Sequence, residues 1–130
     1  MILDTSAIVA VLRAEPEAAD FARAIVSSPK RRVSAVSYVE AAAVIDSGRD
    51  AVASRRFDDF FRASRITVET VSAAQAEIAR QAYRDFGKGR HKAGLNFGDC
   101  FAYALAKEMD EPLLFKGDDF RHTDVEAAQT

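Results

Sequence analysis

Carboxylates from four distant segments are the side chains of this chain best suited to act together. They are Asp4, Glu40, Asp99 and one of the adjacent pair Asp118 and Asp119. Because no set of Cys or His residues accompanies them, the donor type favours a hard cation, so we predict Mg²⁺, or Mn²⁺ as an alternative, over zinc. Such a cation keeps positions open for water and phosphate oxygens, which predicts hydrolysis of phosphodiester bonds.

Each acid also has a local explanation. Asp4 could cap the helical pattern that begins at the next residue, where the hydroxyl groups of Thr5 and Ser6 could either cap the helix or lie beside a phosphate. Glu40 follows Ser37 by three residues, which is the spacing of a capping box. Asp99 follows an asparagine at the same spacing, and the Asp-Asp pair falls in a turn, where Asp is common.

Helical periodicity favours a shared site for two of the four acids. Glu40 lies within an apolar stripe that we expect to face the core and that comprises Val36, Val39, Ala43 and Val44. Asp99 opens a helix that is apolar on nearly all sides, and neither acid has a Lys or Arg three or four positions away. A buried carboxylate without a counter-charge costs several kcal/mol, so a shared metal ion is the predicted partner.

Composition describes a single globular domain. The chain has 130 residues, is 48% hydrophobic, and carries 18 Lys and Arg against 20 Asp and Glu, so we expect one domain over residues 1–130 with no overall attraction to polyanions. A single Cys100 rules out an internal disulfide, and no secretory leader or long apolar run is evident. We therefore expect a cytoplasmic protein that does not enter membranes.

The pattern of elements predicts how the acids come together. Short apolar runs near residues 2–3, 33–35, 65–69 and 113–115 are expected to be strands. Helical patterns cover residues 5–12, 16–26, 36–47, 53–64, 72–86 and 96–109. Such alternation predicts a three-layer α/β/α sandwich with a short central parallel sheet. Ligands of such sheets bind outside the carboxyl ends of the strands, where Asp4 would lie.

These segments resemble the PIN-domain ribonucleases, and among them the VapC-type toxins of bacterial type II toxin–antitoxin modules. The resemblance covers essentially the whole chain and rests on four blocks: MILDTSAIVAVL, SAVSYVEAAAV, LNFGDCFAYALA and LLFKGDDFRHTD. It implies that Asp4 and Asp99 bind the metal directly and that Glu40 completes the site, through water or by orienting the nucleophile. Family turns often read Gly-Asn-Asp-Phe where this chain has Gly-Asp-Asp-Phe, so Asp119 is preferred and Asp118 is its alternate.

The resemblance also implies a function and partners. It describes a Mg²⁺-dependent endoribonuclease that cuts RNA and halts translation and growth when freed from a cognate VapB-like antitoxin, with a homodimer and a toxin–antitoxin hetero-oligomer as its assemblies. Candidate RNA contacts are Lys88, Arg90 and Lys92 in the glycine-rich segment GKGRHKAGL, although a solvated loop is the simpler explanation of these charges. Many relatives have proline after the histidine of this loop, whereas here His91 is followed by Lys92.

Two other classes of protein remain open from the residues. A phosphotransfer domain of the receiver or dehalogenase type also gathers acids at strand ends, but only one aspartate follows the first strand here. A non-catalytic binding module would use the acids structurally or to hold a partner's arginine. Replacement of Asp4 by Asn distinguishes an enzyme from such a module, because in an enzyme it should abolish activity and toxicity yet leave the fold and partner affinity largely intact.

Overall fold

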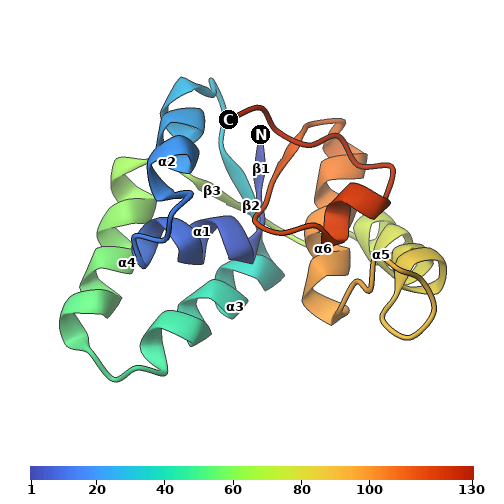
Figure 1. Cartoon of the computed structure of the whole chain (residues 1–130), viewed down its shortest axis with the longest axis horizontal. Coiled ribbons are helices and arrows are strands. Elements are labelled where there is room, and N and C mark those ends of the chain that lie inside the picture. Colours follow the sequence, from blue (N-terminus) through green and yellow to red (C-terminus); the bar gives the residue numbers. More distant parts are fainter.

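Four parallel strands form the centre of the computed structural model, which describes all residues 1–130 (Figure 1). Their order in the sheet is β3-β2-β1-β4. The strands are β1 (Ile2–Leu3), β2 (Arg32–Ser34), β3 (Thr67–Glu69) and β4 (Leu113–Leu114). Every pairing is parallel, so the carboxyl ends of all four strands meet at one edge of the sheet.

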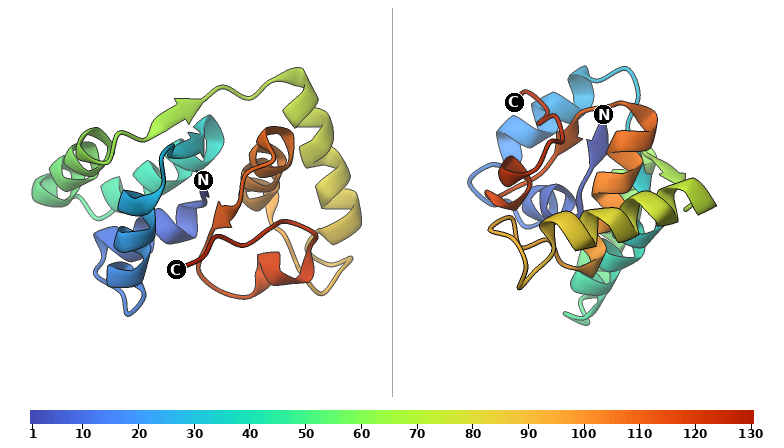
Figure 2. Two further views of the ribbon diagram at one scale, coloured as in Figure 1. Left: turned by 90° about the horizontal axis from the view of Figure 1, so that it is seen from above. Right: turned by 90° about the vertical axis from the view of Figure 1, so that its right-hand side faces the viewer.

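Helices cover both faces of this sheet (Figures 1 and 2). One side carries α1 (Thr5–Leu12), α2 (Ala18–Ser27), α3 (Ala35–Asp46) and α4 (Ala51–Ala63). The other side carries α5 (Ala73–Phe86) and α6 (Phe97–Met109), and a 3₁₀ turn, η1 (Asp119–His122), follows β4. The predicted three-layer α/β/α sandwich with a short central parallel sheet is confirmed.

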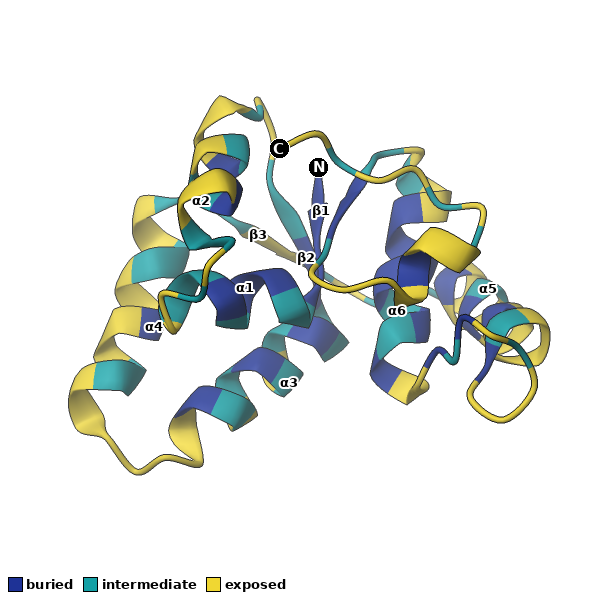
Figure 3. Ribbon diagram, in the orientation of Figure 1, coloured by how far each residue is buried: buried dark blue, intermediate teal, exposed yellow.

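Alternate residues of the strands enter two separate cores. Ile2 and Leu113, which are paired in register, belong to the core beneath α5 and α6. Leu3 and Leu114, the next pair, belong to the core beneath α1 to α4. This alternation follows from the two-residue period of a strand and explains why β1 and β4 are buried on both faces (Figure 3).

Polar side chains fix where the helices begin. Asp4, Ser34, Asp50, Ser72 and Asn96 each accept a hydrogen bond from a backbone N–H in the first turn of the helix that follows. These caps satisfy donors that have no partner within the helix. Helix α3 thus begins directly after β2, so the capping box expected between Ser37 and Glu40 is wrong, because Ser37 already lies inside the helix.

The buried face of α3 differs from the expected one. Ser37, Ala41 and Ile45 face the core, whereas Val39 is 65% exposed and Ala43 is also exposed. The small residues Ser37 and Ala41 let neighbouring helices, among them α1, α4 and α6, pack closely against α3, so hydrophobicity alone does not select its inner face. Glu40 lies beside the buried face and is only partly exposed.

Helix α6 is the most deeply buried helix, as its composition predicts. All residues from Ala102 to Ala106 are buried, and α6 contacts α5, α3 and the strands β1, β2 and β4. Its first residue, Phe97, is nevertheless 73% exposed, and Phe101 is only partly buried. None of the helices combines the length and the apolar character that spanning a membrane requires.

Candidate active site

The four acids lie at the carboxyl edge of the sheet, each on a different element. Asp4 directly follows β1, Glu40 lies in the second turn of α3, Asp99 lies in the first turn of α6, and Asp119 begins η1 after β4. Elements whose residues are up to 115 positions apart in sequence thus bring their carboxylates to one region, as the parallel topology predicts.

Asp4 has one carboxylate oxygen that is bonded and one that is not. Its Oδ2 accepts hydrogen bonds from the backbone N–H of Ser6 at 3.0 Å and from the Ser6 hydroxyl at 2.6 Å. Its Oδ1 is buried and has no hydrogen-bond partner. Burial raises the pKa of Asp4 above its ordinary value, and the charge of Glu40 adds to the rise. An unpaired buried carboxylate oxygen is the strongest local sign that a cation belongs here.

Glu40 connects α1 to α6. The hydroxyl of Thr5 donates a 2.6 Å hydrogen bond to Oε1 of Glu40 and also lies 3.3 Å from the carbonyl oxygen of Ser37. On the opposite side, the carboxylate lies against Gly98, where an added Cβ would overlap Oε2 of Glu40. Only glycine at this position therefore lets α6 approach the carboxylate so closely.

Asp99 combines a capping role with a place in the acid cluster. Its Oδ2 accepts a hydrogen bond from the backbone N–H of Asn96 at 3.0 Å, and the side chain of Asn96 accepts one from the N–H of Asp99 at 2.8 Å. This reciprocal pair confirms the expected capping box. Burial is the largest cause that raises the pKa of Asp99 to about 7. Three carboxylates add to the rise: Asp4, Glu40 and Asp119.

The adjacent residues Asp118 and Asp119 have different surroundings. The carboxylate of Asp118 lies 3.6 Å from the guanidinium of Arg121 and is directed to solvent. Asp119 makes no ion pair, and its charge is one of those that act on Asp99. The turn is held to α1 because the backbone N–H of Lys116 donates a 3.0 Å hydrogen bond to the Ser6 hydroxyl.

The donor set suits a hard cation in type and charge. No Lys or Arg forms an ion pair with any of the four acids Asp4, Glu40, Asp99 and Asp119. As the side chains stand, no three acidic, His or Cys groups surround one point closely enough to hold an ion. Asp4 Oδ1 is nevertheless buried without a hydrogen-bond partner, and burial together with the neighbouring carboxylates raises the pKa of Asp99. To bind an ion together, flexible carboxylates such as Glu40 would have to rotate toward it.

Two parts of this arrangement were not identified from the sequence. One is Gly98, whose signal is a glycine inside the first turn of a helix, a position where its conformational freedom is unfavourable. The other is the role of Thr5 and Ser6, whose hydroxyl groups bind Glu40 and Asp4 and so orient the acids directly. Only the contacts between elements reveal these roles.

The expected RNA contacts lie on one exposed loop, between α5 and α6. Lys88, Arg90 and Lys92 are exposed on a loop that is closed at its base, where the N–H of Lys88 bonds the carbonyl of Leu95 at 2.9 Å. Of the three, Arg90 reaches a groove between α5 and α6. His91 uses Nδ1 to accept a hydrogen bond from the N–H of Ala93, which is a structural role within the loop.

Neither Tyr103 nor Cys100 is set up to react. Burial, followed by the hydrogen bond to Asp124, raises the pKa of Tyr103, whose hydroxyl donates to that carboxylate at 2.5 Å. Burial raises the pKa of the Cys100 thiol to about 11, so the thiol stays protonated.

Lys116 pairs with Glu15 and Glu17, so its ammonium is engaged by those acids, unlike the free lysine that a phosphotransfer site would use.

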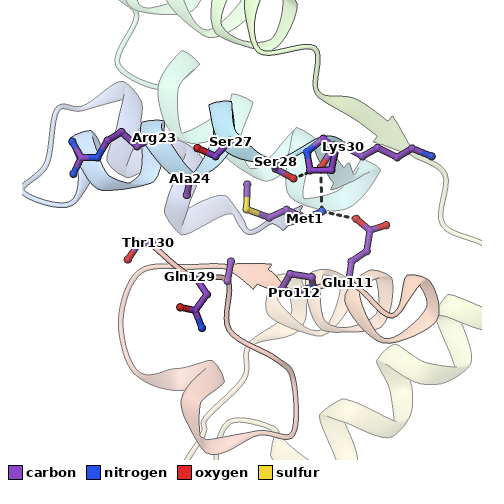
Figure 4. Close-up of a pocket in the computed structure, with 12 residues that line it drawn as sticks. Met1, Arg23, Ala24, Ser27, Ser28, Lys30, Glu111, Pro112, Gln129 and Thr130 are labelled. Carbon is purple, nitrogen blue, oxygen red and sulfur yellow. Dashed lines mark hydrogen bonds and ion pairs between the residues drawn. The ribbon is translucent and has the colours of Figure 1, made fainter.

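A hollow of about 690 Å³ lies at the opposite, amino-terminal edge of the sheet (Figure 4). There the amino group of Met1 donates hydrogen bonds to Glu111 at 2.5 Å and to the carbonyl of Lys30 at 3.1 Å. Glu111 also pairs with Arg32 at 2.9 Å, so the only acidic side chain that lines this hollow is already paired with two cations. Its size therefore does not make it the reactive site.

An all-parallel α/β/α sandwich with acids converging at its carboxyl edge defines the class of protein, and comparison with known proteins agrees. The model of the PIN domain family matches residues 1–126. Over 129 residues the chain is 54% identical to ribonuclease VapC28 of Mycobacterium tuberculosis, covering 98% of this chain and 97% of that protein. It is 50% identical over 127 residues to ribonuclease VapC of Mycolicibacterium smegmatis, covering 98% of each.

A solved structure shows the same fold. The crystal structure of Mycobacterium tuberculosis VapC20, described as a sarcin-ricin loop cleaving toxin, superposes with a TM-score of 0.73 at 18% identity and covers 95% of both chains. The chain therefore belongs to the PIN-domain family and, within it, to the VapC-type ribonuclease toxins.

Proposed function

We propose that this protein is a Mg²⁺-dependent endoribonuclease, with Mn²⁺ as an alternative ion, that acts in the cytoplasm as the toxin of a VapBC-type toxin–antitoxin system. It hydrolyses phosphodiester bonds of RNA and thereby inhibits translation and growth. The observation that carries the proposal is the convergence of unpaired carboxylates at the sheet edge, including the buried, unbonded Oδ1 of Asp4. The names of the relatives as ribonucleases support the same reaction.

Each acid has a role in this proposal. Asp4, through Oδ1, and Asp99 would hold the ion directly, and Glu40 would bind through water or orient the nucleophile. Asp119 would complete the set, with Asp118 as its alternate. The ion supplies positive charge for the phosphate and leaving oxygen and lowers the pKa of water. Thr5 and Ser6 hold Glu40 and Asp4 in place through their hydroxyl groups.

Partners follow from the same proposal. A cognate VapB-like antitoxin would block the site, and an arginine from it would find the unpaired carboxylates a suitable partner. The toxin would also form a homodimer, and with its antitoxin a hetero-oligomer. The shared carboxylates thus serve both ion binding and inhibition.

The deciding experiment is cleavage of a mixed pool of small structured RNAs by the purified chain in Mg²⁺ or in EDTA. We expect cutting that requires Mg²⁺ and that Asp99→Asn abolishes. Sequencing the cut ends identifies the target. Absence of any cutting by a folded chain free of antitoxin, both on this pool and in RNA from expressing cells, would falsify the nuclease proposal.

Three variants sharpen this test. Asp4→Asn should abolish cleavage and growth inhibition yet leave the fold and antitoxin affinity largely intact, whereas full toxicity of the variant would contradict the proposed role of the acids. Asp119→Asn should reduce cleavage far more than Asp118→Asn, because Asp118 already lies near Arg121 and Asp119 acts on Asp99. The opposite order would make Asp118 the fourth acid.

A further inference from the structure

A groove of about 510 Å³ lies between α5 and α6, outside the acid cluster. Apolar parts of both helices form its floor, including Ala79 and Cys100, which are buried. Its rim is different in character, because it carries arginine and aromatic side chains. We call this feature the α5–α6 groove.

Three arginines line the α5–α6 groove without any acidic partner. Arg80 and Arg84 come from successive turns of α5, and Arg90 comes from the loop after it. None of them takes part in an ion pair or a side-chain hydrogen bond, and no Asp or Glu is among the residues that line the groove. In a chain of net charge −2, this is an unusual local excess of free guanidinium groups.

Aromatic rings stand beside these charges. Phe97 is 73% exposed and Tyr83 is 43% exposed, although side chains of this size usually pack inward. Phe97 is supported from below by Phe101, with ring centroids 5.0 Å apart. An exposed, supported ring next to free guanidinium groups matches the chemistry that binds single-stranded nucleic acid, in which bases stack and arginines hold phosphates.

The α5–α6 groove adjoins the candidate active site through Phe97. The same ring also borders a second, shallower hollow that contains Gly98 and Glu40. Asp99 follows two residues later in the same helical turn. A strand lying across Phe97 would therefore have the acid cluster on one side of the ring and the three arginines on the other.

This inference rests on the proposed ribonuclease function. We propose that the α5–α6 groove is a subsite for single-stranded RNA. A base stacks on Phe97 there, and neighbouring phosphates bind Arg80, Arg84 and Arg90. The subsite would hold nucleotides flanking the bond that is cut. It also explains how an acidic protein holds a polyanion, because the positive charge is concentrated beside the acids. A second copy of the chain fits less well, since a two-fold contact centred here would bring the same arginines together.

The test is binding of a fluorescent, mixed-sequence single-stranded RNA by the full chain in EDTA, where it is not cut, alongside cleavage of RNA in Mg²⁺. We expect Arg84→Gln to weaken binding and to lower the dependence of log Kd on log salt by about 0.7. Phe97→Leu should weaken binding about tenfold, whereas Phe97→Tyr, which keeps an aromatic face, should bind like the unmodified chain. Arg55→Gln, an exposed arginine on α4, is the matched control and should change neither quantity.

The outcomes separate this inference from the proposed function. Cleavage by the unmodified chain together with unchanged binding by Arg84→Gln and Phe97→Leu overturns the subsite and leaves the nuclease standing. No cleavage at all is a failure of the nuclease proposal, whatever the groove variants do. A change in sedimentation of the groove variants with unchanged RNA binding would instead make the groove a protein interface and overturn the subsite.

Discussion

At the residue scale, a single carboxylate can cap a helix with one oxygen and belong to the acid cluster with the other. Asp4 uses Oδ2 to cap α1 and leaves Oδ1 buried and unpaired, while Asp99 uses Oδ2 to complete a capping box. The backbone hydrogen bonds hold these acids in place without a counter-cation, so a local capping role and a place in a shared site are compatible. The cost of burying carboxylates close together without a counter-cation appears in the pKa of Asp99, which rises to about 7.

That raised pKa predicts how the metal-free protein responds to pH. Asp99 has an ordinary pKa near 3.8 but titrates at about 7 when folded, so between these values the folded protein keeps a proton that the unfolded chain has lost. The contribution of Asp99 to stability is therefore full below about pH 4 and declines as pH rises to 7. In EDTA we expect Asp99→Asn to raise the Tm more at pH 8 than at pH 5.5, measured by circular dichroism.

Mg²⁺ provides the complementary measurement. Because a cation compensates the ionised carboxylates, its addition should raise the Tm of the unmodified chain more at pH 8 than at pH 5.5. Asp99→Asn should lose most of this Mg²⁺ effect. A Tm gain from Mg²⁺ that is equal at both pH values, or equal in the variant, would contradict the assigned cause.

Gly98 provides a second test at the scale of one residue. A methyl group at this position would overlap Oε2 of Glu40, and the carboxylate, being the end of a flexible chain, would move away. We expect Gly98→Ala to reduce cleavage about 100-fold, since small misplacements of reacting groups are costly. The free energy of unfolding, measured in urea, should change by less than about 1 kcal/mol, because alanine favours the helix.

Gly48→Ala is the matched control for this variant. Gly48 follows α3, and its added Cβ would meet only the carbonyl oxygen of Ile45, at 3.5 Å. This variant should therefore keep full cleavage activity. Unimpaired cleavage by Gly98→Ala would show that the position of Glu40 does not limit the reaction.

At the scale of elements, α6 links the site to the core. Its first turn exposes Phe97, places Gly98 against Glu40 and leaves Asp99 partly exposed, and its centre, Ala102 to Ala106, is buried against α5 and the sheet. Reactive and exposed residues are thus carried by a helix whose remaining turns are fixed by packing. Such a helix holds its first turn rigidly, which favours an accurate site.

Two substitutions distinguish the buried centre of α6 from its rim. Leu105 is fully buried, so Leu105→Ala should lower the free energy of unfolding by about 2–5 kcal/mol. Phe101 is only partly buried and borders the α5–α6 groove, so Phe101→Ala should cost less despite its larger side chain. Urea unfolding measures both, and a larger loss for Phe101→Ala would mean that the rim is as well packed as the centre.

At the scale of the whole molecule, the two edges of the sheet differ in how their charges are paired. The amino-terminal edge holds compensated charges, such as the pairing of Glu111 with the amino group of Met1 and with Arg32. The carboxyl edge holds uncompensated acids, with free arginines nearby in the α5–α6 groove. All strands are parallel, so one edge collects every residue that follows a strand, and the charges there accumulate.

The way the strands divide between two cores also predicts how the molecule unfolds. Neighbouring strand residues, Ile2 with Leu3 and Leu113 with Leu114, belong to opposite cores, so neither core persists without the other. We expect a single cooperative transition over residues 1–130, with equal calorimetric and van't Hoff enthalpies in differential scanning calorimetry. Two resolved transitions would contradict the prediction of a single domain.

The sequence alone determined those features that depend on fixed local geometry. The alternation of strands and helices predicted the α/β/α sandwich, and the spacing of Asn96 and Asp99 predicted their capping box. These inferences succeed because the periods of helices and strands and the spacing of caps are set by the backbone itself.

Only the tertiary structure decided which faces meet. It buried Ser37 and Ala41 of α3 in place of Val39, placed Gly98 against Glu40, and joined Arg84 to Arg90 along one groove. Periodicity relates residues within one helix, but it does not say which neighbouring element each face will contact. That choice depends on shape and close packing between segments far apart in the chain, which no local pattern contains.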